Sequence, residues 1–257
     1  MIKKTFLVLF LFVCALALFL VARIPASVAW QHVIAPATNV RSVGVIAKSF
    51  SGTVWNGKAH IAFRHIEGVL SWDVQLSKVF WGSLPATLEL RSTAGDIDAD
   101  IVASISEQSV QFDSVTLAMD ALNPFLRPQR VKLDGDLFVK NLRLVAKDSE
   151  LMSVAGRFSW SGGDVSYLAG RSMRQRSFPS FSGSLNTDDT DTISVGIRDQ
   201  GASFDVMRGD WSYNGDAVWE VTRRLLDIAQ EPWSQNSSES DVVFKLKKPI
   251  PRSWINE

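Results

Sequence analysis

The sequence predicts a mainly β protein, in which an N-terminal transmembrane helix is followed by a single antiparallel β-sheet domain with one short helix near the C-terminus. Two observations predict this class. A single long apolar run near the N-terminus contains no charged residue and no proline, and most of the remaining chain alternates apolar with polar residues at a period of two. We expect the sheet to be a meander of hairpins, curved or shaped like half a barrel.

The apolar run covers residues 6–22 and is bounded by Lys3 and Lys4 before it and by Arg23 after it. At 1.5 Å per residue a helix of this length measures about 25 Å, which is within the usual range for a membrane span. The two lysines predict that the N-terminus stays in the cytoplasm and that the chain after Arg23 lies on the far side of a single-pass protein.

A cleaved signal peptide is the alternative interpretation, because Ser27-Val28-Ala29 resembles a cleavage site of small residues. The length of the apolar run and the arginine after it favour a retained anchor. The expected domains are therefore residues 1–23, a cytoplasmic tip with the anchor, and residues 24–257, an exported β domain.

The period-two alternation predicts half-buried antiparallel strands, since a parallel sheet covered on both faces would show continuous apolar runs. The segments with this pattern are residues 70–76, 84–90, 97–105, 115–119, 193–197 and 242–246. Between residues 137 and 144 the alternation changes phase, which predicts a bulge near Asn141. Glycines near the starts of segments are expected to serve turns; these are Gly68, Gly82, Gly95, Gly135 and Gly183.

One stretch, residues 216–230, has helical spacing instead. Its apolar residues are Val218, Val221, Leu225 and Ile228. Pro232 follows the stretch, and we expect the only helix outside the membrane here, with Arg223 and Arg224 facing solvent. The C-terminal tail contains Pro249 and Pro251, which cannot belong to a central strand.

Composition narrows the function. The chain has 27 Lys+Arg and 27 Asp+Glu, so its formal net charge of +0 gives no reason to expect a nucleic-acid partner. The one cysteine, Cys14, lies inside the apolar run, so the exported part has no thiol for a disulfide or a metal. No nucleophile elbow, HExxH, P-loop or dinucleotide fingerprint occurs. We therefore predict no enzyme activity, no catalytic or metal-binding residue and no cofactor.

Three sets of residues carry side chains that can bind metals, and in each the pattern favours another role. In an extended segment His60 and His65 would point to opposite faces, and His32 lies far from both in the sequence. Asp96, Asp98 and Asp100 would share one strand face, which is also typical of a solvated face. Asp188, Asp189 and Asp191 are expected in a hairpin turn.

Two further features are ambiguous. Arg171, Arg174 and Arg176 could meet phospholipid headgroups or an acidic partner, although a solvated loop between strands is the simpler interpretation. The tryptophans Trp55, Trp72, Trp160 and Trp211 occur in strand-like contexts, where core packing is favoured over a ligand groove. Trp30 follows the anchor closely enough for an interfacial position.

Three elements behind one anchor resemble the protein N family of the type II secretion system. They are Gly52-Thr53-Val54-Trp55-Asn56-Gly57, Leu70-Ser71-Trp72 and the stretch from Phe158 to Tyr167. The resemblance implies an accessory component in the inner membrane of a Gram-negative bacterium, with a periplasmic β domain that takes part in export of folded proteins across the outer membrane. It implies other secretion-machinery proteins as partners and no catalytic residues. The polar insert at residues 234–240 and the charged tail depart from the family pattern.

A looser likeness to AsmA-like periplasmic proteins suggests an alternative function, the binding of a lipid or acyl chain by the sheet. For the GTVWNG motif we expect a corner of the sheet, in which the glycines allow a tight bend or close strand approach and Trp55 supplies apolar surface.

Overall fold

The computed structural model describes residues 19–34, 44–104, 107–147, 150–188, 192–212, 216–233 and 236–249. The chain divides after Ser92 into two compact units. Most of the predicted anchor lies outside the described residues, and its last four residues, 19–22, are helical. In the described part of the chain no helix is both long and apolar enough to cross a membrane. The boundary predicted at residue 23 and the single domain over residues 24–257 stay predictions.

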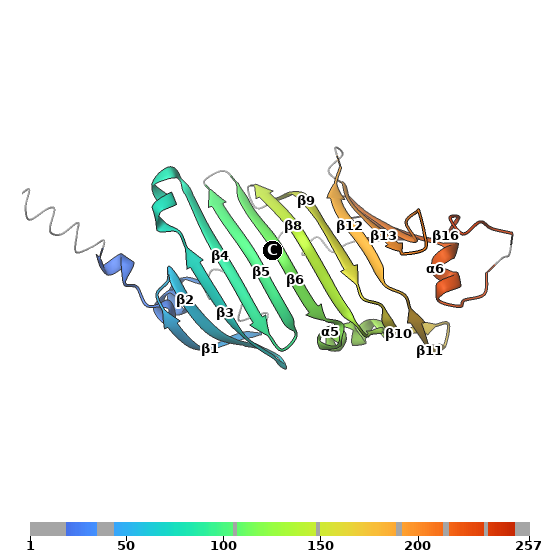
Figure 1. Cartoon of the computed structure of the whole chain (residues 1–257), viewed down its shortest axis with the longest axis horizontal. Helices are drawn as coiled ribbons and strands as arrows, with labels where there is room; N and C mark the ends of the chain where they lie inside the picture. Colours follow the sequence, from blue (N-terminus) through green and yellow to red (C-terminus); the bar gives the residue numbers. More distant parts are fainter. Residues whose placement is uncertain are drawn as a thin grey trace, which may run out of the picture. The chain divides into compact units, whose positions relative to one another are not determined.

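The first unit is a meander of four antiparallel strands that pair in chain order (Figure 1). The strands are β1 (Val45–Gly52), β2 (Asn56–Phe63), β3 (Ile66–Val74) and β4 (Ser83–Ser92). Before them come the short helix α2 (Ala26–Ala29) and the π-helical turn η1 (Trp30–Ile34), and the 3-10 helix η2 (Leu76–Trp81) joins β3 to β4. The predicted strands at 70–76 and 84–90 are confirmed, except that the first ends at Val74.

The second unit contains nine strands of the antiparallel sheet, in the order β5-β6-β8-β9-β12-β13-β14-β15-β16. The bounds are β5 (Gly95–Ser104), β6 (Gln108–Ala118), β8 (Asp136–Lys147), β9 (Glu150–Trp160), β12 (Phe181–Thr187), β13 (Thr192–Asp199), β14 (Met207–Ser212), β15 (Asp216–Thr222) and β16 (Val242–Pro249). A small second sheet joins β11 (Ser172–Phe178), β10 (Gly163–Ala169) and β7 (Lys132–Leu133). The prediction of a mainly β protein with one large antiparallel sheet is confirmed.

The bulge predicted near Asn141 is present. Asn141 has φ +51°, and it interrupts the pairing of β8 with β9 between Lys140 and Arg143. On its other side β8 keeps an unbroken register with β6. The extra residue restores the phase of the pleat, so Val139 and Leu142 both remain on the apolar face although their positions differ in parity.

The helix predicted over residues 216–230 is wrong for its first half. Residues Asp216–Thr222 form β15, which pairs with β14 on one side and β16 on the other. The helix α6 covers only Arg223–Ile228. Pairing on both edges satisfies the backbone of β15 completely, and this outweighs the helical spacing of Val218 and Val221. The prediction of a short helix near the C-terminus therefore holds only for the segment after Thr222.

A second helix was not predicted. α5 (Met119–Leu126) follows β6 directly, and Met119, which had been assigned to a strand, begins it. Pro124 lies inside α5, and a proline normally argues against a helix interior. A 3-10 turn, η3 (Arg127–Gln129), follows. α6 is accordingly not the only helix among the residues described beyond the anchor.

Arg224 does not simply face solvent. Its Nη2 lies 3.0 Å from Oδ2 of Asp199, a residue of which only 5% is exposed, and its Nη1 lies 3.4 Å from Oε2 of Glu239. The hydrogen bond with Asp199 raises the pKa of Arg224, so the guanidinium remains charged. Arg223 is also partly covered and pairs with Asp227 at 3.4 Å. The prediction of two solvated arginines is wrong, because the pairing anchors α6 to the end of β13.

Two glycines that were expected in turns lie inside strands. Gly183 is within β12 and pairs with Phe158 on β9, whose ring would be 2.3 Å from a Cβ added at Gly183. Gly68 lies inside β3. By contrast Gly82, Gly95 and Gly135 have positive φ at segment starts, as predicted. Gly209 on β14 lies opposite Trp219 on β15 in the same way as Gly183 lies opposite Phe158. A glycine paired with a large aromatic ring is therefore a recurrent feature of this sheet.

Candidate functional site

The turn that joins β1 to β2 contains the GTVWNG motif. Gly52 has φ +84°, and a Cβ at this position would lie 2.4 Å from the carbonyl oxygen of Asn56. The backbone N–H of Thr53 donates to that same oxygen at 2.8 Å. The Thr53 hydroxyl accepts from the backbone N–H groups of Trp55 and Asn56 at 3.3 and 3.2 Å. The prediction of a sheet corner with a tight bend is confirmed, with Trp55 in the turn and not in a strand.

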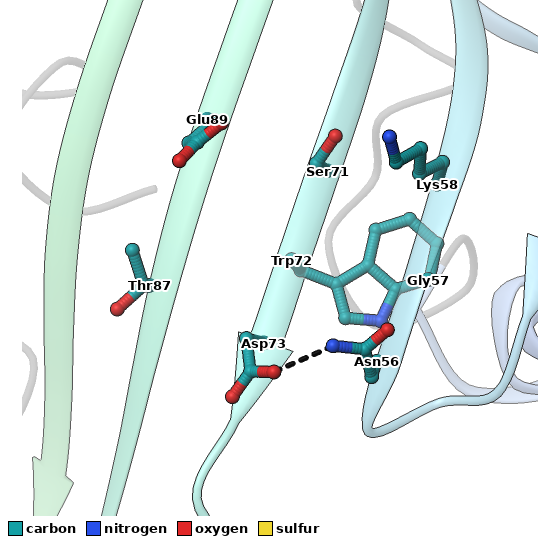
Figure 2. A pocket seen from close by; sticks show the side chains of 8 residues that line it. All are labelled: Asn56, Gly57, Lys58, Ser71, Trp72, Asp73, Thr87 and Glu89. Atoms are coloured by element: carbon teal, nitrogen blue, oxygen red, sulfur yellow. Dashed lines mark hydrogen bonds between the residues drawn. The ribbon is translucent and has the colours of Figure 1, made fainter.

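The second glycine of the motif allows the close approach of Trp72. Gly57 pairs with Trp72 across β2 and β3, and a Cβ on Gly57 would lie 2.6 Å from Cζ2 of the ring. Figure 2 shows the indole reaching across to Gly57. The Trp72 Nε1–H donates to the carbonyl oxygens of Thr53 and Val54 at 3.2 and 3.1 Å. The ring therefore packs on the hairpin through its apolar surface and closes the turn through its polar atom.

The turn also holds the end of the N-terminal helical segment. Nε1 of Trp55 donates to the carbonyl oxygen of Val21 at 2.9 Å. The backbone N–H of Val54 donates to the carbonyl oxygen of Ile24 at 3.0 Å. Pro25 forms an isolated antiparallel bridge with Thr53. Carbonyls in the last turn of a helix lack their usual partner four residues on. The Val21 carbonyl accepts one long bond, from the backbone N–H of Ile24 at 3.4 Å, and the indole gives it a second and shorter one.

Polar side chains lie beside the turn on β2, β3 and β4, where they line a pocket (Figure 2). Its lining residues are Asn56, Gly57, Lys58, Ser71, Trp72, Asp73, Thr87 and Glu89. Asn56 Nδ2 donates to Asp73 Oδ2 at 2.5 Å, which ties the first residue of β2 to β3. The side chains that line the pocket offer hydrogen-bonding groups and both signs of charge.

The histidines and aspartates that could bind a metal do not come together in the described part of the chain. His60 is exposed on β2, His65 lies in the turn after it, and His32 is in η1. Asp98 accepts a hydrogen bond from the Ser114 hydroxyl at 2.9 Å. Asp188 caps the turn between β12 and β13 by accepting from the N–H of Thr192 at 2.9 Å. Asp189 and Asp191 lie outside the described residues, and among the residues that are described no three His, Cys, Asp or Glu form a metal site.

The predicted arginine loop is wrong for two of its three members. Arg171 is in the turn after β10, but Arg174 and Arg176 belong to β11. Arg174 pairs with Glu231, whose other carboxylate oxygen accepts from the Tyr167 hydroxyl at 2.7 Å. The hydrogen bond from Tyr167, and after it the contact with Arg174, lower the pKa of Glu231. Burial, and after it the hydrogen bond to Glu231, raise the pKa of Tyr167. The cluster joins β10 and β11 to the chain after α6.

In the second unit, one face of the sheet carries a continuous apolar row across nine strands. The row consists of Ile97, Val115, Val139, Phe158, Gly183, Ile197, Met207, Val221 and Phe244. Within it only Val115 is buried, while Phe244 is exposed and the others are half-buried. Side chains sealed between two layers would be buried almost completely, so this face retains apolar surface.

Trp72 and Trp211 do lie in strands, as predicted, and Trp160 ends β9. The Trp160 ring stacks on Phe181 at 5.9 Å and its Nε1–H donates to the Asp134 carbonyl at 2.8 Å, while Trp211 packs edge-on against Trp219 at 5.6 Å. Sequence reasoning did not find Val21 and Ile24 as partners of the turn, nor the Asn56–Asp73 contact. For the contacts with Val21 and Ile24, the one signal in the sequence is that an unusual turn follows a nearby helix end.

The fold and the site define an antiparallel β protein whose first hairpin is fixed to the end of an apolar N-terminal segment. The model of the type II secretion system protein N family matches residues 44–232, which is more than half of the chain. The chain therefore belongs to this family, whose members are accessory components of protein secretion. No curated protein and no solved structure matches the chain.

Proposed function

We propose that this protein is a non-enzymatic accessory component of the type II secretion system, held in the inner membrane by residues 6–22. Its β sheet lies in the periplasm and takes part in export of folded proteins across the outer membrane by contacts with other secretion-machinery proteins. The observation that carries the proposal is the family match over residues 44–232.

The turn at Gly52–Gly57 supports the anchored arrangement. Trp55 and Val54 hydrogen-bond to Val21 and Ile24, so the sheet is connected to the end of the apolar segment by more than the covalent chain. The exposed side chains of Phe19, Leu20 and Val21 are 57%, 60% and 47% accessible, which suits a segment that continues into lipid.

Deletion of the gene in its host tests the role in secretion. We expect normally secreted enzymes to accumulate in the periplasm and to return to the medium when the full chain is supplied again. A chain with residues 6–22 replaced by a cleavable signal peptide is the matched test of anchoring. If it restored secretion while fully soluble, the anchor would be dispensable; normal secretion in the deletion strain would reject the proposed role.

A second candidate function is the binding of a lipid acyl chain, and the apolar row of the second unit favours it. Hydrocarbon side chains that keep accessible surface can cover an acyl chain by the same burial that stabilises a core. The row would span about 38 Å if neighbouring strands are about 4.8 Å apart, which exceeds the length of one acyl chain.

A phospholipid with a photoactivatable acyl chain distinguishes the two functions. Adducts on Val139, Phe158 or Ile197 would support lipid binding, whereas adducts confined to residues 6–22 would report only the anchor. Val139→Glu places a charge in the row and should remove those adducts. Lys140→Glu is the matched control, because Lys140 is the next residue on the same strand and is exposed.

A further inference from the structure

The strand β16 ends the strand order of the second unit, and among the described strands only β15 pairs with it. In an antiparallel pair every second residue directs its N–H and C=O groups away from the partner, so β16 offers an open hydrogen-bonding edge. It runs through Pro249, which agrees with the prediction that this tail cannot form a central strand. The strand follows the region that the family model matches.

One side of β16 is unusually apolar for a free edge. Phe244 and Leu246 lie on this side and are 51% and 60% exposed, while a register shift between Val221 and Thr222 turns Val242 to the other side. Trp233, which is 41% exposed, packs against Phe244 with ring centroids 5.1 Å apart. Natural edges are usually blunted by short length or charge, whereas this side presents three large apolar residues, Trp233, Phe244 and Leu246, that gain by being covered.

The other side of β16 is basic. Lys245 Nζ lies 2.8 Å from Glu220 Oε1, and Lys247 Nζ lies 2.8 Å from Asp216 Oδ2, both across the pair with β15. The two lysine side chains are still 65% and 64% exposed. An ammonium group has three donors, so each lysine can accept a second carboxylate from a strand added outside β16.

These charges argue against a second copy of β16 as the added strand. Residues directly opposite each other in a β pair point to the same face. An antiparallel pairing of β16 with itself that sets Leu246 opposite Phe244 or Leu246 therefore brings Lys245 opposite Lys245 or Lys247 on the other face. Like charges in opposite positions destabilise a pair. A segment with carboxylates at the matching positions would instead be stabilised.

We propose that β16 is a docking edge that accepts an extended segment of another protein in which apolar and acidic residues alternate. The apolar residues of the segment cover Phe244 and Leu246, and its carboxylates lie beside Lys245 and Lys247. The edge strand supplies main-chain hydrogen bonds, and the alternating side chains supply specificity. This inference rests on the proposed function in one respect: the segment is taken to come from a protein of the secretion machinery.

Synthetic peptides of the same length as β16 test the edge on the purified full chain in detergent micelles. One peptide alternates Val or Ile with Glu, and its matched control carries Lys in place of Glu. Binding is measured against empty micelles, and hydrogen exchange locates it. We expect the acidic peptide to bind about three- to tenfold more tightly at low salt, with slower exchange of β16 amides.

A charge-swapped chain provides the second variant. Combining Lys245→Glu with Glu220→Lys, and Lys247→Glu with Asp216→Lys, keeps both internal ion pairs but makes the edge acidic. We expect this chain to prefer the basic peptide, while circular dichroism verifies that it folds. Failure of this assay would not affect the secretion phenotype of the deletion strain, so the two hypotheses fail separately.

Any of four results would overturn the inference. Neither peptide slows exchange in β16, or both bind equally, or the preference persists after the charge swap. If neither peptide slows exchange, the lysines serve only to keep other strands from pairing with β16. If β16 amides become protected at high protein concentration without peptide, the occupant is a second copy and the acidic segment is wrong.

Discussion

The indole Nε1 of Trp55 lies 2.9 Å from the carbonyl oxygen of Val21, and this hydrogen bond joins the turn of the first hairpin to the end of the N-terminal helical segment. The two residues are thirty-four positions apart in the chain. Trp55 is half-buried, so its contribution comes from one directed hydrogen bond together with partial burial of the ring.

Replacing Trp55 by Phe removes the hydrogen bond and keeps most of the apolar ring. We expect a loss of about 1 kcal/mol in the free energy of unfolding, and about 2 kcal/mol for Trp55→Ala, in which the ring is also lost. Urea unfolding followed by circular dichroism measures both. Trp81→Phe is the control, because Trp81 is 85% exposed and should change stability little. Equal effects at both positions would contradict the role assigned to the Val21 contact.

Gly57→Ala should destabilise the first unit by about 1 to 3 kcal/mol, because the new Cβ would lie 2.6 Å from the Trp72 ring and 2.7 Å from the Ser51 carbonyl oxygen. The change is measured as a shift in the urea midpoint. Trp72→Phe combined with Gly57→Ala should cost less than the sum of the two single changes, since the smaller ring leaves room. Strict additivity would mean that the two residues do not compete for space.

Arg224→Ala should cost about 3 to 5 kcal/mol, because it leaves the Asp199 carboxylate buried without its counter-charge. Arg198→Ala is the matched control on the same strand as Asp199. Its partner Asp205 is 2.6 Å away, but the Arg198 side chain is 57% exposed, so its loss should cost less than about 1 kcal/mol. Thermal or urea unfolding compares the two. A smaller effect for Arg224→Ala than for Arg198→Ala would contradict the assignment.

Glu231→Gln should change how stability depends on pH. The hydrogen bond from Tyr167, and after it Arg174, lowers the pKa of Glu231 in the folded chain. Its stabilising contribution is therefore complete above the ordinary carboxyl pKa of about 4.3 and is lost as the pH falls through the lower folded pKa. The difference in urea midpoint between wild type and Glu231→Gln should be largest near neutral pH and shrink in acid.

Tyr167→Phe serves as the control for that experiment. It removes the hydrogen bond that contributes most to the lowered pKa of Glu231 and leaves Arg174 in place. The acid-sensitive part of the stability should become smaller in this variant, because only the arginines then lower the pKa of Glu231. A difference between wild type and Glu231→Gln that stays constant across the pH range would show that the carboxylate is not stabilised in the folded chain.

Alternation of apolar residues predicted parts of six strands, β3, β4, β5, β6, β13 and β16, because a half-buried sheet imposes a period of two on its sequence. The bulge at Asn141 was predictable for the same reason, since a change of phase can be accommodated only by an extra residue. Residues 216–222 could not be assigned by local spacing, because their strand conformation depends on pairing with Met207–Ser212 and Val242–Pro249, which are distant partners.

The candidate site was only partly predictable. The GTVWNG motif pointed to a tight turn, since two glycines flank a tryptophan within it. Its contacts with Val21 and Ile24 depend on which surface the helix end meets, and no periodicity encodes that. The exposure of Phe244 and Leu246 was likewise not predictable, because their segment has the same alternation as any half-buried strand. What leaves them exposed is that no further strand lies beside β16 in the described part of the chain.

The bonds between residues 21–25 and the β1–β2 turn also define a mechanical path. A force that pulls on the N-terminal segment reaches the turn through the Val21 and Ile24 carbonyls and the Pro25 bridge before it can extend the chain between Pro25 and Val45. The hydrogen bonds would have to break before that intervening chain carried load. Tension on the N-terminal segment would thus be delivered directly to the first hairpin of the sheet.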